Sequence, residues 1–282
     1  KLLLDEMAAD AGVEVRFFAR LIDADADPAS RQVRGAIVHE VDGYHSLAAP
    51  AFIDCTGDAF LCEHCGVEYE QAGRDTEHIM PASLCWVGAG IDWGRAKRPR
   101  DYVEQARAAG DFPYNEFRTV TGRMDAGMGG FNAGHLYELD AVDPVALSAG
   151  MAEGRRIAHA YNEFHRRHVP GYENMLVAAT APLMGVRESR RSREAREDFP
   201  GPGDAYGIPY GVTVPKGWKN LWVAGRCASC DVTVHGSLRV MPAAAMMGQA
   251  AALAAVQALR SDQNACDLDT RQLVDALRET GA

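Results

Sequence analysis

A short apolar strand, a glycine and then a helix of very small residues is the feature that most constrains the fold. The strand covers residues 221–224, Gly225 ends it, and Pro242 opens a helix that continues to about Arg260. The backbone can approach a ligand closely at such a glycine, and free N–H groups at a helix start stabilise negative charge by about 0.3 to 1 kcal/mol. The pattern predicts an anion-binding cradle, although an ordinary alanine-rich helix packed on a sheet fits it equally well. The small residues that would let the helix lie against a ring or a sheet are Ala243, Ala244, Ala245, Gly248, Ala251 and Ala252.

The composition indicates an acidic globular protein. Hydrophobic residues make up 47% and charged residues 24%, which is enough apolar surface for a core and excludes disordered and fibrous chains. The 29 basic and 39 acidic side chains give a net charge of −10, so nucleic-acid and anionic-membrane partners are not expected. Residues 240–259 carry no charge, but they lack the large aliphatic residues that drive membrane insertion, and we expect a buried helix. Seven cysteines without a disulfide-framework spacing indicate the cytoplasm.

The pattern along the chain changes twice. Residues 1–70 and 205–282 show α/β patterns, whereas residues 71–204 combine short strands, glycine-rich connections and one long helix opened by Asp143 and Pro144. We therefore predict one α/β domain built from both ends of the chain around an inserted α+β substrate domain. Strands in the first part are expected at 13–25, 33–41 and 44–53, with Asp42-Gly43 as a hairpin turn.

Seven short segments spread over nearly the whole chain carry a family resemblance: Ala11-Gly-Val-Glu-Val15, Ile53-Asp-Cys-Thr-Gly-Asp58, Met80-Pro-Ala-Ser83, His168-Val-Pro-Gly-Tyr-Glu173, Gly185-Val-Arg-Glu-Ser-Arg-Arg191, Ile208-Pro-Tyr210 and Ala224-Gly-Arg226. They resemble FAD-dependent oxidoreductases with the glutathione-reductase type of fold, most closely the bacterial FAD-dependent oxidoreductase family. The resemblance implies a three-layer FAD/NAD(P)-binding domain with FAD as cofactor. That family holds the flavin pyrophosphate with an N-terminal glycine-rich loop, and no Gly-x-Gly-x-x-Gly motif follows a strand here. We therefore expect an N-terminally incomplete domain that belongs to a longer polypeptide.

The resemblance also implies which residues contact FAD. Adenine would lie against Arg20 and Leu21, and the adenosine and pyrophosphate side would lie against Thr56, Gly57 and Asp58. The ribityl and pyrophosphate would lie against Gly225 and Arg226. The isoalloxazine would lie against Val240, Met241 and Pro242.

Four residues are candidates for catalysis. Hydride transfer needs a group that holds the substrate's oxygen and a group that moves the accompanying proton. Arg239 could clamp a carboxylate and His235, in a glycine-flanked loop, could move the proton, although a structural role fits His235 equally well. Arg187 and Arg190 are second candidates, for closing the site. The same run contains two further arginines, Arg191 and Arg193. They stand near glutamates, and we interpret them as surface ion pairs.

Two Cys-x-x-Cys pairs leave other interpretations open. Cys62 and Cys65 lie on a predicted helix, and Cys227 and Cys230 lie beside the proposed flavin site. A redox-active dithiol beside flavin is chemically sensible, but buried thiols that act as small hydrophobes are favoured. The 161 residues between Cys65 and Cys227 far exceed the roughly 15 to 20 of a zinc ribbon. We predict an FAD-dependent oxidoreductase that acts by hydride transfer on a small anionic organic substrate and needs no metal, with an oligomer left open. A cofactor-free relative or subunit is the alternative, and a metal-binding protein is the weakest one.

Overall fold

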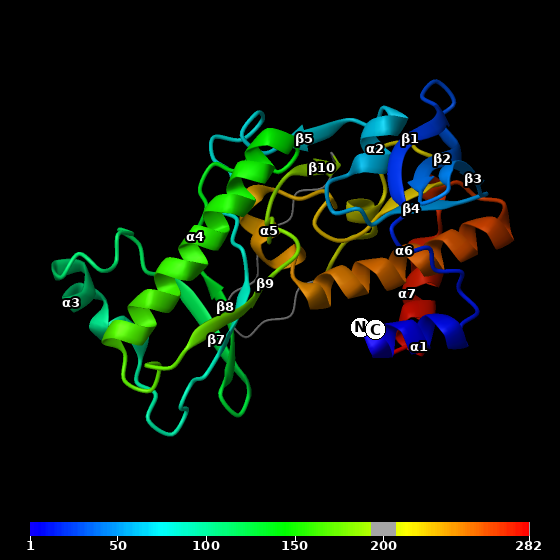
Figure 1. The fold of residues 1–282 in the computed structure, drawn as a ribbon. Helices are drawn as coiled ribbons and strands as arrows, with labels where there is room; N and C mark the ends of the chain where they lie inside the picture. Colours follow the sequence, from blue (N-terminus) through cyan, green and yellow to red (C-terminus); the bar gives the residue numbers. More distant parts are fainter. Residues whose placement is uncertain (193–206, 282) are drawn as a thin grey trace. The chain divides into compact units, whose positions relative to one another are not determined.

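The computed structural model describes residues 1–192 and 207–281, which form two compact units (Figure 1). Unit 1 consists of Lys1–Glu70 and Arg190–Ala282, and unit 2 of Gln71–Ser189. The middle unit therefore ends at Ser189 instead of residue 204. The reason is that β10 (Arg190–Ser192) pairs with β5 (Tyr69–Gln71), which returns the chain to unit 1.

Unit 1 contains an antiparallel sheet in the order β1 (Arg20–Asp27), β2 (Gln32–Glu40) and β3 (Gly43–Ala48). The predicted Asp42-Gly43 hairpin is confirmed. The strand predicted at 13–25 begins only at Arg20, because pairing with β2 starts there and the preceding Phe17 and Phe18 are exposed. The run predicted at 44–53 is two strands, β3 and β4 (Phe52–Asp54), separated at Pro50, which has no N–H for a ladder.

The parallel part of unit 1 pairs β4 with β11 (Leu221–Val223). Of the sheet expected in a glutathione-reductase-like domain, the described residues contain these two parallel strands. The α/β class is thus observed, while the three-layer arrangement stays a prediction. The helices of unit 1 are α1 (Leu2–Asp10), α2 (Phe60–Cys65), α5 (Val232–Leu238), α6 (Met241–Ser261) and α7 (Thr270–Glu279).

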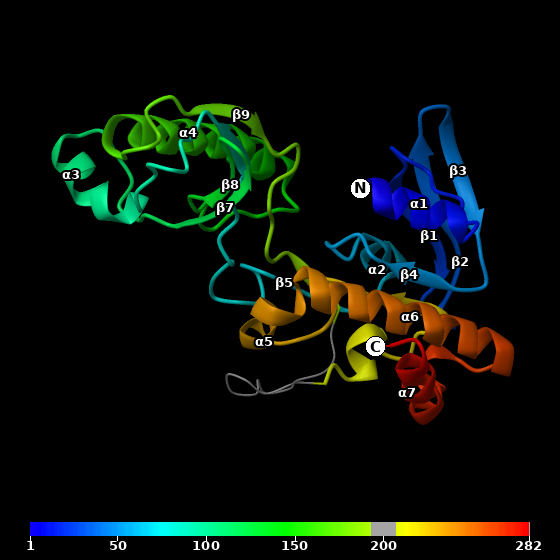
Figure 2. The same cartoon turned by 90° about the horizontal axis from the view of Figure 1, so that it is seen from below.

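Helix α6 is the alanine-rich helix that the sequence predicts. By length and composition alone it could cross a membrane, a test that buried core helices also pass. Its buried face includes Ala251 and Ala254, which pack with Trp222 of β11 and with Leu273 of α7. Figure 2 shows the short helix α7 lying against α6 at a steep angle. Small side chains on this face let the helix lie close to β11, as predicted.

Unit 2 is an antiparallel sheet in the order β7 (Thr119–Asp125), β8 (Met128–Ala133), β6 (Trp86–Ala89) and β9 (Leu176–Thr180). The predicted long helix is α4 (Pro144–His168), and the Asp143 carboxylate caps it by accepting from the N–H groups of Val145 and Ala146. Buried side chains of β6 and β8 pack with α4, so the helix covers one face of the sheet. A short helix, α3 (Val103–Ala108), completes the core.

We expect the free energy of unfolding to depend on pH through His165 of α4. Burial lowers the pKa of His165 from 6.5 to about 4. Between these values the unfolded chain takes up a proton that the folded unit does not, so stability falls as the pH drops from about 6.5 to about 4. At about 1.4 kcal/mol per pH unit, the loss reaches about 3 kcal/mol.

Denaturant unfolding measured across this pH range tests the effect. His165→Gln should flatten the slope, whereas His78→Gln, which changes an exposed histidine of the same unit, should keep it. Equal slopes for His165→Gln and the parent chain would show that His165 does not cause the dependence.

Candidate functional site

Two glycine turns lie at the carboxyl ends of the parallel strands β4 and β11. The strands pair in register from Phe52 with Leu221, and the N–H of Ala224 donates to the carbonyl of Asp54. Gly57 follows β4 with φ +81° and Gly225 follows β11 with φ +91°. Both backbones are in the left-handed region, which glycine adopts without steric cost. Crevices outside the carboxyl ends of parallel strands are where open α/β sheets bind ligands.

An ion pair joins the two turns. A guanidinium nitrogen of Arg226, after β11, lies 2.5 Å from a carboxylate oxygen of Asp58, after β4. Contact between the turns is close, because a Cβ added at Gly57 would lie 2.9 Å from Cζ of Arg226. The structure thus brings together four predicted FAD contacts, Gly57, Asp58, Gly225 and Arg226.

Asp54 organises the first turn, a role that the sequence interpretation missed. Its carboxylate is 1% exposed and accepts hydrogen bonds from the N–H (2.9 Å) and the hydroxyl (2.7 Å) of Thr56. It also accepts from the N–H of Cys62 at 3.0 Å, so it ties α2 to the turn. A carboxylate that ends the otherwise apolar segment Phe52-Ile53-Asp54 is the signal that could have identified it.

A cleft of about 610 Å³ in unit 1 brings Thr56 together with the predicted adenine contacts Arg20 and Leu21. Strand β1 supplies one wall, and α2 supplies Phe60 and His64. Its volume lies in the range of small-molecule sites. Segments that the resemblance assigns to adenine and to adenosine therefore line one cavity.

The start of α6 fits a negatively charged or electron-rich ligand. Val240 precedes the helix without a side-chain cap, Pro242 lies in the first turn, and Met241 is 86% exposed. A Cβ added at Gly225 would meet no atom within 4 Å, so space remains open beside the second turn. The described residues therefore leave backbone that a cofactor could approach at the start of α6 and beside Gly225.

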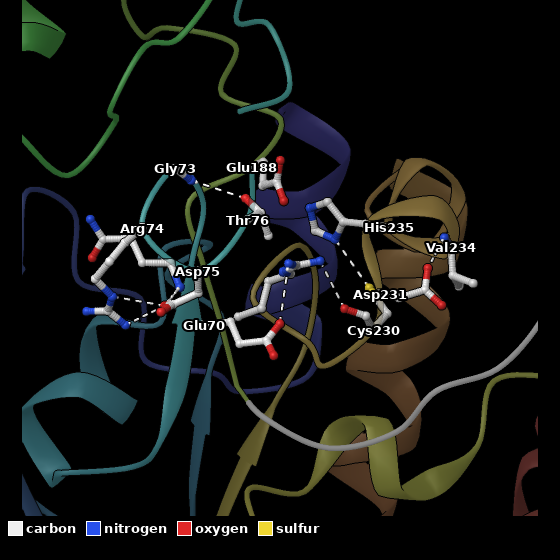
Figure 3. A network of polar contacts seen from close by, with 12 residues as sticks. Glu70, Gly73, Arg74, Asp75, Thr76, Glu188, Cys230, Asp231, Val234 and His235 are labelled. Carbon is white, nitrogen blue, oxygen red and sulfur yellow. Dashed lines mark hydrogen bonds and ion pairs between the residues drawn. The ribbon is translucent and has the colours of Figure 1, made fainter. Parts of the chain in front are cut away.

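His235 lies on α5, where the sequence predicted a loop. Asp231 caps this helix by accepting from the N–H of Val234 at 2.9 Å. The imidazole is 1% exposed, and its Nδ1 lies 3.3 Å from the sulfur of Cys230 (Figure 3). Arg239 is half-buried at the end of the same helix. The two first candidates for catalysis are thus one helical turn apart, and His235 faces a thiol in the interior.

The reading of Arg191 as a surface residue is wrong. Arg191 is 1% exposed, and it donates to the carbonyl of Cys230 at 2.9 Å and lies 3.6 Å from the carboxylate of Glu70. Burial of a cation requires such partners, and here it connects β10 to the loop before α5. The same prediction for Arg193 lies outside the described residues.

Arg190 makes structural contacts within unit 1, and its predicted role in closing the site stays a prediction. Its guanidinium pairs with the carboxylate of Glu63 on α2. It also lies over the rings of Phe60 and Tyr69, at 5.6 and 5.4 Å from their centroids. These contacts hold β10 against α2 and β5.

Arg187 belongs to unit 2. It donates to the carbonyl of Pro81, to the hydroxyl of Ser83 at 3.1 Å and to the side-chain oxygen of Asn132 at 3.4 Å. Burial lowers the pKa of its guanidinium below the ordinary range. The four catalytic candidates are therefore divided between the units, with Arg187 on unit 2 and the other three on unit 1.

The cysteine pairs form part of the core of unit 1. Cys62, Cys65 and Cys227 are buried in one apolar cluster, and burial raises their thiol pKa values, to about 12 for Cys65 and Cys227. Thiols held in the neutral form are poor nucleophiles and poor metal ligands. Among the described residues, the group that meets the spacing of a metal site is instead the hairpin set Glu40, Asp42 and His45. The structure therefore favours the reading of these cysteines as small hydrophobes.

The family described as FAD dependent oxidoreductase matches residues 1–195 and 192–277. The chain belongs to this FAD-dependent oxidoreductase family. Membership confirms the predicted family, whose cofactor is FAD. The glutathione-reductase subtype stays a prediction.

Two solved structures are similar to this family member. The ternary complex of aklavinone-11 hydroxylase with FAD and aklavinone has 13% identity and a TM-score of 0.50, over 92% of this chain and 41% of that chain. A triple mutant of the flavin-dependent brominase Bmp2 has 13% identity and a TM-score of 0.50, over 98% of this chain and 58% of that chain. This chain thus spans about half the length of either structure, and at this identity the likeness concerns the fold alone. No curated protein sequence matches the chain.

Proposed function

We propose that unit 1 holds FAD at the two glycine turns and that the protein oxidises or reduces a small organic substrate by hydride transfer. One observation carries this proposal. Gly225 leaves open space at the end of β11, and Arg226 paired with Asp58 joins this turn to the turn at Gly57, after the adjacent parallel strand β4. Family membership supports the same cofactor.

Different residues of unit 1 would contact different parts of FAD. The cleft with Arg20, Leu21 and Thr56 suits an aromatic base with its ribose. The turn at Gly225 leaves room for the pyrophosphate, and Arg226 supplies a positive charge beside it. The exposed start of α6 has free N–H groups that favour a negatively charged ring edge.

Arg239 and His235 retain their proposed roles in the reaction. When bound, FAD would supply the group that accepts or gives the hydride. Arg239 would hold the oxygen of the substrate group that reacts. His235, held with Nδ1 3.3 Å from the Cys230 sulfur, would take the accompanying proton from the substrate in an oxidation and return it in a reduction.

A titration of the purified protein with FAD tests the proposal. We expect stoichiometric binding and a yellow protein that absorbs near about 450 nm. A protein that binds no FAD at concentrations up to about 1 mM would contradict the proposal and favour the cofactor-free relative.

Arg239→Met should make the reduction potential of bound FAD more negative by about 30 mV, which corresponds to about 1.4 kcal/mol for two electrons. The reason is that a nearby cation stabilises the negatively charged reduced form. Arg260→Met, which removes an exposed cation from the other end of α6, is the control and should leave the potential unchanged. An equal shift of the reduction potential in both variants, or no shift in Arg239→Met, would show that Arg239 does not lie near the bound flavin.

A further inference from the structure

We propose that unit 2 binds an uncharged, planar ring system on the open face of its four-stranded sheet, and that this ring is part of the substrate. That the ring is part of the substrate rests on the proposed function. Binding of the ring itself depends on unit 2 alone. The sequence predicted an anionic substrate, and the lining of this face favours a neutral one.

The open face follows from strand alternation. Trp86 of β6 and Phe131 of β8 are 2% exposed and pack with α4. Successive side chains of a strand point to opposite faces, so Val87 and Asn132 lie on the face away from α4. Val87 pairs with Ala179 of β9. The described residues therefore give unit 2 one face in the core and one open face.

A hollow of about 530 Å³ lies at this open face. Gly130, Val87 and Ala179 lie side by side across β8, β6 and β9 in its lining, and Val120, Met124 and Pro182 add larger apolar groups. Val120 is 73% exposed and Met124 is 61% exposed. Exposed apolar side chains gathered around a hollow mark binding sites, and the volume suits a small molecule. This row is a stretch of apolar sheet surface without long side chains of its own, which fits a flat ring better than a bulky one.

No charged residue lines the hollow. Its polar groups are uncharged and belong to Asn132, Thr180 and Cys85. The side-chain oxygen of Asn132 accepts from the hydroxyl of Ser83 at 2.6 Å, which fixes the orientation of the amide. Its NH₂ group is then available to a hydroxyl or carbonyl oxygen on the ring. The nearest cation is Arg187, whose guanidinium does not line the hollow and already donates to the carbonyl of Pro81, the hydroxyl of Ser83 and the oxygen of Asn132. A charged ligand would therefore lose water here without gaining a lining group of opposite charge.

Fluorescence titration of the full chain with 2-naphthol, in the absence of FAD, tests the proposal. We expect saturable binding that Ala179→Phe weakens at least about tenfold, because the added ring fills the hollow. Ala108→Phe is the matched control, since Ala108 is an exposed residue of α3 in the same unit and outside the lining, and it should bind like the parent chain. The anion 2-naphthoate should bind at least about tenfold more weakly than 2-naphthol.

Three results would overturn the proposal: no saturable binding of 2-naphthol, equal weakening by the two phenylalanine variants, or tighter binding of 2-naphthoate. Circular dichroism of both variants shows whether they fold, and Val120→Trp provides a second, exposed way to fill the hollow. FAD binding is titrated separately. If the parent chain binds FAD but not 2-naphthol, the proposed site in the hollow is wrong and the proposed function stands. If it binds 2-naphthol but not FAD, the proposed function is wrong and the site in the hollow stands.

Discussion

Gly57→Val should weaken FAD binding at least about a hundredfold. A β-branched residue in the left-handed region costs on the order of 1–2 kcal/mol or more, and the added Cβ would lie 2.9 Å from Cζ of Arg226. Both effects displace the turn and its ion pair with Asp58. The dissociation constant, obtained by flavin fluorescence titration, measures the change.

Gly110→Val separates loss of the site from loss of stability. Gly110 has φ +77°, and a Cβ there would meet no atom within 4 Å, so this variant carries the backbone strain without the contact. It lies in unit 2 and should keep the parent affinity for FAD. Equal affinities for Gly57→Val and Gly110→Val would show that the first turn does not bind the cofactor.

Asp54→Ala should lower the free energy of unfolding by about 4 kcal/mol. The substitution leaves the N–H groups of Thr56 and Cys62 without their acceptor, and lost bonds to a charged group cost about 1.5 to 3 kcal/mol each. FAD affinity should fall as well, because the turn loses the carboxylate that fixes it. Chemical denaturation followed by circular dichroism measures the first effect.

Asp25→Ala is the control for Asp54→Ala. Asp25 is an exposed carboxylate of β1, paired with Arg34 at the surface, and its removal should change stability little. If Asp54→Ala proved no more destabilising than Asp25→Ala, the carboxylate would not organise the turn.

The elements that the sequence predicts best are those whose signals are local. The long helix after Asp143 and the hairpin at Asp42-Gly43 each depend on capping or turn residues within a few positions. The strand that ends at Gly225 and the helix that Pro242 opens also follow from adjacent residues. Local signals failed where a strand needs a partner, as before Arg20, because pairing depends on residues far along the chain.

The roles of the charged side chains were harder to predict for the same reason. Arg190 and Arg191 stand beside Glu188 and Glu194 in the sequence, but in the structure they bind Glu63, Glu70 and the carbonyl of Cys230. The sequence suggested a surface pair for Arg191 and a role in closing the site for Arg190, whereas distant partners bury both arginines. The cofactor contacts were predicted by resemblance, and the structure supports their grouping through the ion pair of Asp58 and Arg226.

A crystal structure of the protein with FAD tests the central claim most directly. The account predicts density for adenine in the cleft lined by Arg20 and Leu21, and for the pyrophosphate beside Gly57 and Gly225. FAD bound at another place, with the two glycine turns packed against polypeptide, would contradict it.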